Sequence, residues 1–177
     1  PLMLAVPLEE AEVGGFDIAS FRAEWKWDGI RVQLGAGGER PRIYSRAADE
    51  ITASFPEIAE AMTFDAVLDG ELLVVVDGEV RPFNDLQQRL NRKTVTAAML
   101  AQFPAWVRLY DILFEGAEDL RGLGFDARRA RLEAWYAAVG PARMDLSPLI
   151  PFEGWADLAV RRDGARADAI EGLMLKR

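Results

Sequence analysis

The sequence predicts an α+β fold built mainly on antiparallel sheets with flanking helices. Two observations support this fold class. Segments with the apolar pattern of strands, such as Trp106–Phe114, are mixed with segments of helical periodicity, such as Asp126–Val139. The two kinds follow one another without a regular strand–helix–strand alternation, so a parallel, doubly wound sheet is not expected.

The first expected elements are strands. Phe21–Leu34 has the composition of one strand, and the glycine-rich turn 35–38 leads into a second strand around Arg42–Ser45. A further strand starts at Ala66 and is expected to be interrupted at Asp69-Gly70. These segments supply the first part of a sheet.

A hairpin is expected next, because Asp77-Gly78 is typical of the tight turn that joins two adjacent strands. Its arms are Leu72–Val76 and Glu79–Pro82. Two later strands are expected at Trp106–Phe114 and Ala169–Lys176.

Two of the expected helices begin at polar capping residues. Ser54, with Glu57 three residues later, is typical of a helix N-terminus, and Asn84 is expected to cap a helix that runs through Leu90. Arg89 suits the C-terminal end of that second helix, where cations favour the helix dipole. The other helices are expected at Thr96–Phe103, Asp126–Gly140 and Trp155–Arg161. In the longest of them, Trp135 lies on an apolar stripe and is expected to pack in the core.

The bulk composition limits the possible chemistry. A chain of 177 residues, 50% of them hydrophobic, can bury one sizeable core, so a single domain over residues 1–177 is expected. No apolar run is long enough to span a bilayer and no signal peptide is recognisable at the start, which predicts a soluble, cytoplasmic protein. The chain has neither cysteine nor histidine, so catalysis would use lysine, carboxylates, arginine or a bound metal. The net charge of −8 argues against a protein that binds nucleic acid nonspecifically over its whole surface. Local clusters of cationic side chains could still bind it.

One segment, residues 24–31, has the residues needed for chemistry on a phosphate. Lys26 lies between two tryptophans and is followed by Asp28, Gly29 and Arg31. A lysine near aromatic rings and a second cation can lose its proton and become a nucleophile, whereas an ordinary lysine with a pKa of about 10.4 cannot attack at neutral pH. The alternative is a solvated strand lysine beside core tryptophans, and this pattern alone does not decide between the two.

Carboxylates also interrupt two hydrophobic strands. Asp69 and Glu71 flank a glycine, and two acids in a packed strand need a cation or a ligand unless they sit on an exposed bulge. Glu171 lies at the start of an apolar strand segment that ends in Lys176, and a carboxylate in this position suits Mg²⁺. Tyr110 could stack on a base, although a strand tyrosine is more often part of the core.

These segments, taken in order, resemble the adenylation domain of bacterial ATP-dependent DNA ligases. The resemblance covers nearly the whole chain and rests on five ordered motifs. They are Lys26-Trp-Asp28-Gly29-Ile-Arg31, Ser45-Arg46, Asp69-Gly70-Glu71, Tyr110-Asp111 and Glu171-Gly-Leu-Met-Leu-Lys176. Many relatives carry glycine shortly after the Ser-Arg pair, where this chain has Ala47-Ala48, so the local loop is expected to differ.

The resemblance implies an ATP-grasp-like nucleotidyltransferase fold and a role for each matching residue. Lys26 would attack the α-phosphate of ATP and become lysyl-AMP, and Asp28 and Glu171 would hold Mg²⁺. The nucleotide would be bound by the remaining matching residues. Glu24 would contact the adenine edge, Tyr110 its face, Glu71 a ribose hydroxyl, and Arg31, Arg46 and Lys176 the rest of the nucleotide.

The resemblance also implies partners. The AMP would pass to the 5′-phosphate of nicked double-stranded DNA, which the 3′-hydroxyl then seals, in DNA repair and replication around the nucleoid. The chain would be a monomeric fragment, lacking an N-terminal DNA-binding domain and a C-terminal oligonucleotide-binding domain. The alternatives are an RNA ligase, a capping-type nucleotidyltransferase, and a noncatalytic module that kept the fold.

Overall fold

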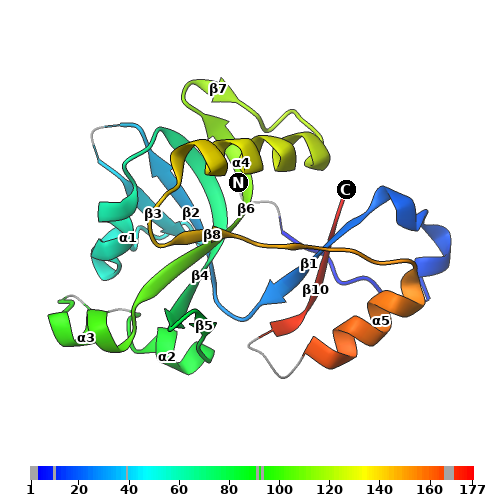
Figure 1. Ribbon diagram of the computed structural model, residues 1–177, viewed down its shortest axis with the longest axis horizontal. Coiled ribbons are helices and arrows are strands. Elements are labelled where there is room, and N and C mark those ends of the chain that lie inside the picture. The colour runs from blue at the N-terminus through cyan, green and yellow to red at the C-terminus, as the bar shows by residue number, and fades with distance from the viewer. Residues whose placement is uncertain (1–3, 10, 39, 91, 93, 166–169) are drawn as a thin grey trace. The chain divides into compact units, whose positions relative to one another are not determined.

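The computed structural model describes residues 4–9, 11–38, 40–90, 92, 94–165 and 170–177. The chain forms two compact units (Figure 1). The terminal unit combines the two ends of the chain, Pro1–Trp27 and Pro148–Arg177, and the central unit is the continuous segment Asp28–Ser147. None of the helices in the described part of the chain is long and apolar enough to cross a membrane.

The terminal unit contains a small antiparallel sheet covered by one helix. Its strands are β1 (Arg22–Trp27), β9 (Leu149–Ile150) and β10 (Ile170–Lys176), in the order β10-β1-β9. Two short 3₁₀ helices, η1 (Val13–Gly15) and η2 (Ile18–Ser20), precede β1, and α5 (Trp155–Gly164) packs on β10 (Figure 1). Ala23, Ile150 and Leu158 form the centre of its core.

The central unit contains a seven-stranded sheet, most of it antiparallel. The main path runs β3-β2-β4-β6-β7, with β5 pairing with β4 and β8 running parallel to β6. The strands are β2 (Ile30–Ala36), β3 (Arg42–Ser45), β4 (Ala66–Val76), β5 (Glu79–Val80), β6 (Ala105–Glu115), β7 (Glu118–Asp119) and β8 (Met144–Leu146). The α+β class with mainly antiparallel sheets is therefore confirmed.

Helices cover this sheet and close its core. The helical segments are η3 (Thr52–Ser54), α1 (Pro56–Ala61), α2 (Phe83–Gln87), α3 (Ala97–Gln102) and α4 (Phe125–Val139). Both α1 and α4 contact β6, and Figure 1 shows α4 crossing this strand. Trp135 of α4 is 4% exposed and packs edge-to-face on Phe64, which confirms its expected place in the core.

Several local predictions are confirmed. The hairpin turns at Asp77-Gly78, where both residues have the positive φ that such a turn requires. The helix predicted at Thr96–Phe103 is α3, and Gly140 ends α4 in the left-handed conformation. The last strand is β10, although Ala169, at its predicted start, lies outside the described residues.

Other local predictions are wrong. The single strand predicted over Phe21–Leu34 is two strands in two sheets, β1 and β2, separated at Asp28-Gly29. By contrast, β4 continues through Asp69-Gly70 without interruption. The irregularity predicted there is borne by the neighbouring strand β6, whose register shifts at this point.

The predicted caps at Ser54 and Asn84 are also wrong. Neither α1 nor α2 has a side-chain cap, because α1 follows Phe55 and α2 follows Pro82. Glu57 and Arg89 instead form a buried ion pair with Nη1–Oε1 and Nη2–Oε2 distances of 2.7 and 2.9 Å. Arg89 also donates to the carbonyl of Ser54, so the residue predicted to favour a helix dipole also holds the start of α1 in place.

Candidate functional site

The terminal unit places the predicted nucleophile on the polar face of its sheet. In the β1–β10 pair, Lys26 stands opposite Gly172 and Glu24 opposite Met174. Alternate residues of a strand share a face, so Glu24 and Lys26 lie together, while Trp25 packs into the core on the other side. The strand pleat therefore turns this tryptophan away from the lysine.

Two ion pairs join β1 to β10 on the terminal unit. The Nζ of Lys26 pairs with the carboxylate of Glu171, and the two side chains are 47% and 46% exposed. The Nζ of Lys176 donates to Glu24 over 3.0 Å, and Glu24 is only 1% exposed. A buried carboxylate is costly without a cation, which Lys176 supplies. Four of the predicted site residues are thus brought together on two paired strands.

The central unit forms a second polar face around Glu71. Glu71 on β4 stands opposite Arg31 on β2 and opposite Arg108 on β6. Arg31 donates from Nη2 to Oδ2 of Asp69 over 2.7 Å, and Gln33 donates to the other oxygen over 3.1 Å. Asp69, 4% exposed, is thus the acid that holds Arg31 in place.

The electrostatic surroundings keep Arg31 positively charged. Burial lowers the pKa of its guanidinium, but the hydrogen bond to Asp69 and the nearby charges, including that of Glu71, raise it more. The net effect is a pKa above the ordinary arginine value. Arg31 therefore offers a permanent cation beside Glu71.

Tyr110 occupies a bulge on β6. Gly70 stands opposite Leu109 and Asp69 opposite Asp111, so Tyr110 is the extra residue between them. A bulge of this kind redirects a side chain and is frequent beside active sites. Gly70 allows it, because a methyl group there would lie 2.7 Å from Cγ1 of Val107 and 2.9 Å from the carbonyl oxygen of Arg108.

Gly29 is needed for a second close approach. A Cβ at this position would lie 2.5 Å from the carbonyl oxygen of Leu72 and 2.9 Å from Cγ of Glu71. Backbone atoms cannot make room for it without moving the strand. The glycine of the lysine motif thus lets β4 and Glu71 take up their positions.

The remaining predicted residues lie outside these clusters. Arg46 is exposed in the turn after β3, where Ala48 has a left-handed φ of 66°. Asp28 belongs to the central unit and Glu171 to the terminal unit. Within the described ranges, no group of three or more acidic, histidine or cysteine side chains could hold a metal ion.

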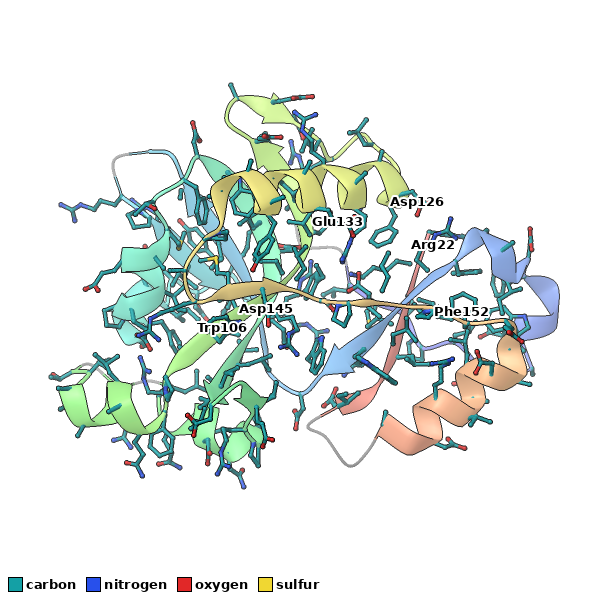
Figure 2. The ribbon with its side chains drawn as sticks, in the orientation of Figure 1. Arg22, Trp106, Asp126, Glu133, Asp145 and Phe152 are labelled. Carbon is teal, nitrogen blue, oxygen red and sulfur yellow. The ribbon has the colours of Figure 1, made fainter. Side chains whose placement is uncertain are left out.

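The sequence-based site omitted several polar residues that the folded sheet brings together. Arg108 forms a two-pronged ion pair with Asp145 of β8, which Figure 2 labels, and Arg128 forms another with Asp111. Gln33 completes the shell of Asp69. The alternation of polar and apolar residues along β6 is the sequence signal that could have pointed to Arg108. No feature of the nearby sequence identifies Asp145 as its partner.

A comparison with protein families gives this arrangement its context. The family model described as "ATP dependent DNA ligase domain" matches residues 2–177. The chain belongs to this family. A "Probable DNA ligase" of Koribacter versatilis is 33% identical over 184 residues, covering 97% of this chain and 31% of that protein.

Solved structures from the same family have the same fold. The ligase domain of Mycobacterium tuberculosis LigD matches with a TM-score of 0.71 and 25% identity, covering 93% of this chain and 51% of the other. A mycobacterial DNA ligase D complexed with ATP and MES matches with a TM-score of 0.70 and 26% identity, covering 93% and 50%. These matches confirm the nucleotidyltransferase fold. The chain thus spans about a third of its curated relative and about half of these ligase structures.

Proposed function

We propose that this member of the ATP-dependent DNA ligase family forms lysyl-AMP at Lys26. The Nζ, once deprotonated, attacks the α-phosphorus of ATP, a nitrogen–phosphorus bond forms, and the bond to the pyrophosphate oxygen breaks. The observation that carries the proposal is the position of Lys26. It is half-exposed on the polar face of β1, two residues from the buried Glu24 and paired with Glu171.

The other residues of the terminal unit would bind the nucleotide beside this lysine. Glu24 would accept a hydrogen bond from the adenine amino group, since its carboxylate is buried and fixed by Lys176. Lys176 would hold Glu24 and offset negative charge near the phosphates. Buried, preoriented groups of this kind give selectivity, because a mismatched base would leave them unpaired.

The central unit would bind the sugar and the base. Glu71 would accept a hydrogen bond from a ribose hydroxyl, and Arg31, fixed by Asp69, would contact the sugar-phosphate. Tyr110, aimed by its bulge, would stack on the adenine face. Arg46 would reach the nucleotide or the 5′-phosphate of the nick from its exposed turn.

We propose Mg²⁺ as the metal cofactor of this reaction, with Asp28 and Glu171 as its protein ligands. Asp28 and Glu171 offer carboxylate oxygens, and Mg²⁺ in phosphoryl-transfer sites is commonly held by one or two carboxylates, substrate phosphates and water. When bound, Mg²⁺ would offset the charge on the phosphate oxygens.

The products of this step suggest the next partner. We infer that the AMP passes to the 5′-phosphate at a nick in double-stranded DNA, after which the 3′-hydroxyl displaces it and seals the strand. With a net charge of −8, the chain would contact DNA through local cations rather than through its overall charge. We also propose that the protein acts as a monomer in the bacterial cytoplasm. Its role there would be in DNA repair and replication.

The decisive experiment measures covalent labelling of this chain by ATP labelled at the α-phosphate. The wild-type chain is expected to take up label, and Lys26→Ala to take up none. Lys93→Ala, which also removes one lysine, is the matched control and should label normally. Equal labelling of all three proteins, absence of label from the wild type, or label from GTP in preference to ATP would overturn the proposal.

A further inference from the structure

Glu71, the predicted ribose-binding residue, stands between two arginines that are each held by an outer aspartate. On one side, Arg31 is held by Asp69. On the other, Arg108 stands directly opposite Glu71 on β6. Its Nε and Nη2 donate to the two oxygens of Asp145 over 2.9 and 2.7 Å. Directly opposed side chains on antiparallel strands lie close enough to interact.

Asp145 is itself held firmly. It lies on β8, which runs parallel to β6 and places Asp145 beside Arg108. The Tyr136 hydroxyl donates to the carbonyl of Met144, and the N–H of Ser147 donates to the carbonyl of Leu109, so β8 is anchored on both sides of Asp145. A two-pronged arginine–carboxylate pair on a fixed strand restricts the guanidinium to one orientation.

We propose that Arg108 and Asp145 are positioning residues for nucleotide binding. Asp145 holds Arg108, and Arg108 in turn fixes the carboxylate of Glu71 for a ribose hydroxyl. The two side chains are 14% and 33% exposed, so the pair is only partly screened by solvent. This inference rests on the proposed function, because it concerns how Glu71 meets ATP.

The expected effect is on discrimination between nucleotides. If Arg108 positions Glu71 to bind a ribose hydroxyl, loss of Arg108 weakens the binding of ATP more than the binding of a deoxynucleotide that lacks this hydroxyl. We expect Asp145→Asn and Arg108→Gln each to reduce the preference for ATP over 2′-deoxyATP or 3′-deoxyATP, whichever the wild type discriminates, by about tenfold. Because both changes act through the same ion pair, the preference for ATP should fall no further in the double variant than in either single variant.

The exchanged pair Arg108→Asp/Asp145→Arg separates positioning from simple stabilisation. It restores an ion pair between β6 and β8 but places an anion opposite Glu71. We expect it to regain melting temperature relative to the single variants and to remain poor in discrimination. Should the exchanged protein fail to fold, the two single variants still decide the question, since the melting temperature and the nucleotide preference are measured for each.

The measurement is the concentration dependence of covalent labelling by α-labelled ATP and the two deoxynucleotides. Arg121→Gln is the control, because Arg121 forms a similar two-pronged pair with Asp119 on the exposed surface. This inference alone is overturned if Asp145→Asn prefers ATP over the deoxynucleotides as strongly as Arg121→Gln does. It is also overturned if the wild type shows no such preference. No labelling of the wild type with any nucleotide overturns the proposed function, and this inference with it.

Discussion

Replacing Gly29 by alanine tests the close approach between the lysine motif and β4. The added methyl group would lie 2.5 Å from the carbonyl oxygen of Leu72, 2.7 Å from Cδ2 of Leu73 and 2.9 Å from Cγ of Glu71. Comfortable contacts between carbon atoms are about 3.5–4.0 Å, so the two strands must separate by roughly 1 Å. The contact with Leu72 cannot be relieved by a side-chain rotation, because it involves the backbone.

Two magnitudes follow from this geometry. Forcing extra volume into a packed site costs about 1–3 kcal/mol, which for a chain of this size lowers the melting temperature by about 2–12 °C. A shift of about 1 Å at Glu71 also misplaces the ribose, and a misplacement of that size can slow a reaction about 100-fold. We therefore expect Gly29→Ala to fold with reduced stability and to form lysyl-AMP much more slowly.

The assay compares Gly29→Ala with Gly35→Ala. Gly35 also belongs to the β2 region, has no positive φ, and has open space within 4 Å of the Cβ position, so its replacement should leave stability and rate nearly unchanged. Urea unfolding gives the free energies, and single-turnover labelling with ATP gives the rates. The reasoning is refuted if the two variants match in both quantities.

Three further changes test the central unit. Arg89→Met should lower the free energy of unfolding by about 3–5 kcal/mol, measured in urea, because it leaves the Glu57 carboxylate buried without its cation; replacing both residues by apolar ones should recover most of the loss. Burial raises the pKa of Glu57, but the hydrogen bonds from Arg89 and the backbone lower it more, so its net pKa lies below the ordinary 4.5. The stability contributed by this ionisation is present above that value and lost as the pH falls through the folded-state pKa, so the stability difference between wild type and Glu57→Gln should shrink on acidification in urea titrations. Ala48→Gly should raise the free energy of unfolding by about 0.5–1 kcal/mol, because alanine is strained at a φ of 66°; a loss of stability would show that this turn is not left-handed in solution.

Features that depend on short stretches of sequence were predictable. The Asp77-Gly78 hairpin, the end of α4 at Gly140 and the core position of Trp135 each follow from residues within a few positions of one another. The predictions at Ser54 and Asn84 failed, although both residue types favour caps. Ser54 is instead the last residue of the 3₁₀ helix η3, and α1 begins at Pro56 with Phe55 in the capping position.

The candidate site was predictable in its residue types but not in its partners. Motif order predicts site roles for Lys26 and Glu71, whereas the support of Arg31 by Asp69 depends on how β2 and β4 align. The bulge at Tyr110 likewise exists only relative to β4, so no property of β6 alone reveals it. Strand register is set by packing across the sheet, which single-sequence patterns do not contain.

The composition of the terminal unit from both ends of the chain has a consequence for synthesis. The strand that carries Lys26 pairs with β10, and the Lys176–Glu24 hydrogen bond spans 152 positions. The central unit is continuous and can form while the chain is still emerging from the ribosome, but β1 completes its pairing only after β9 and β10 have been made. A nascent or prematurely ended chain that lacks β10 therefore carries Lys26, the proposed nucleophile, without Glu171 and without the strand that stands opposite it.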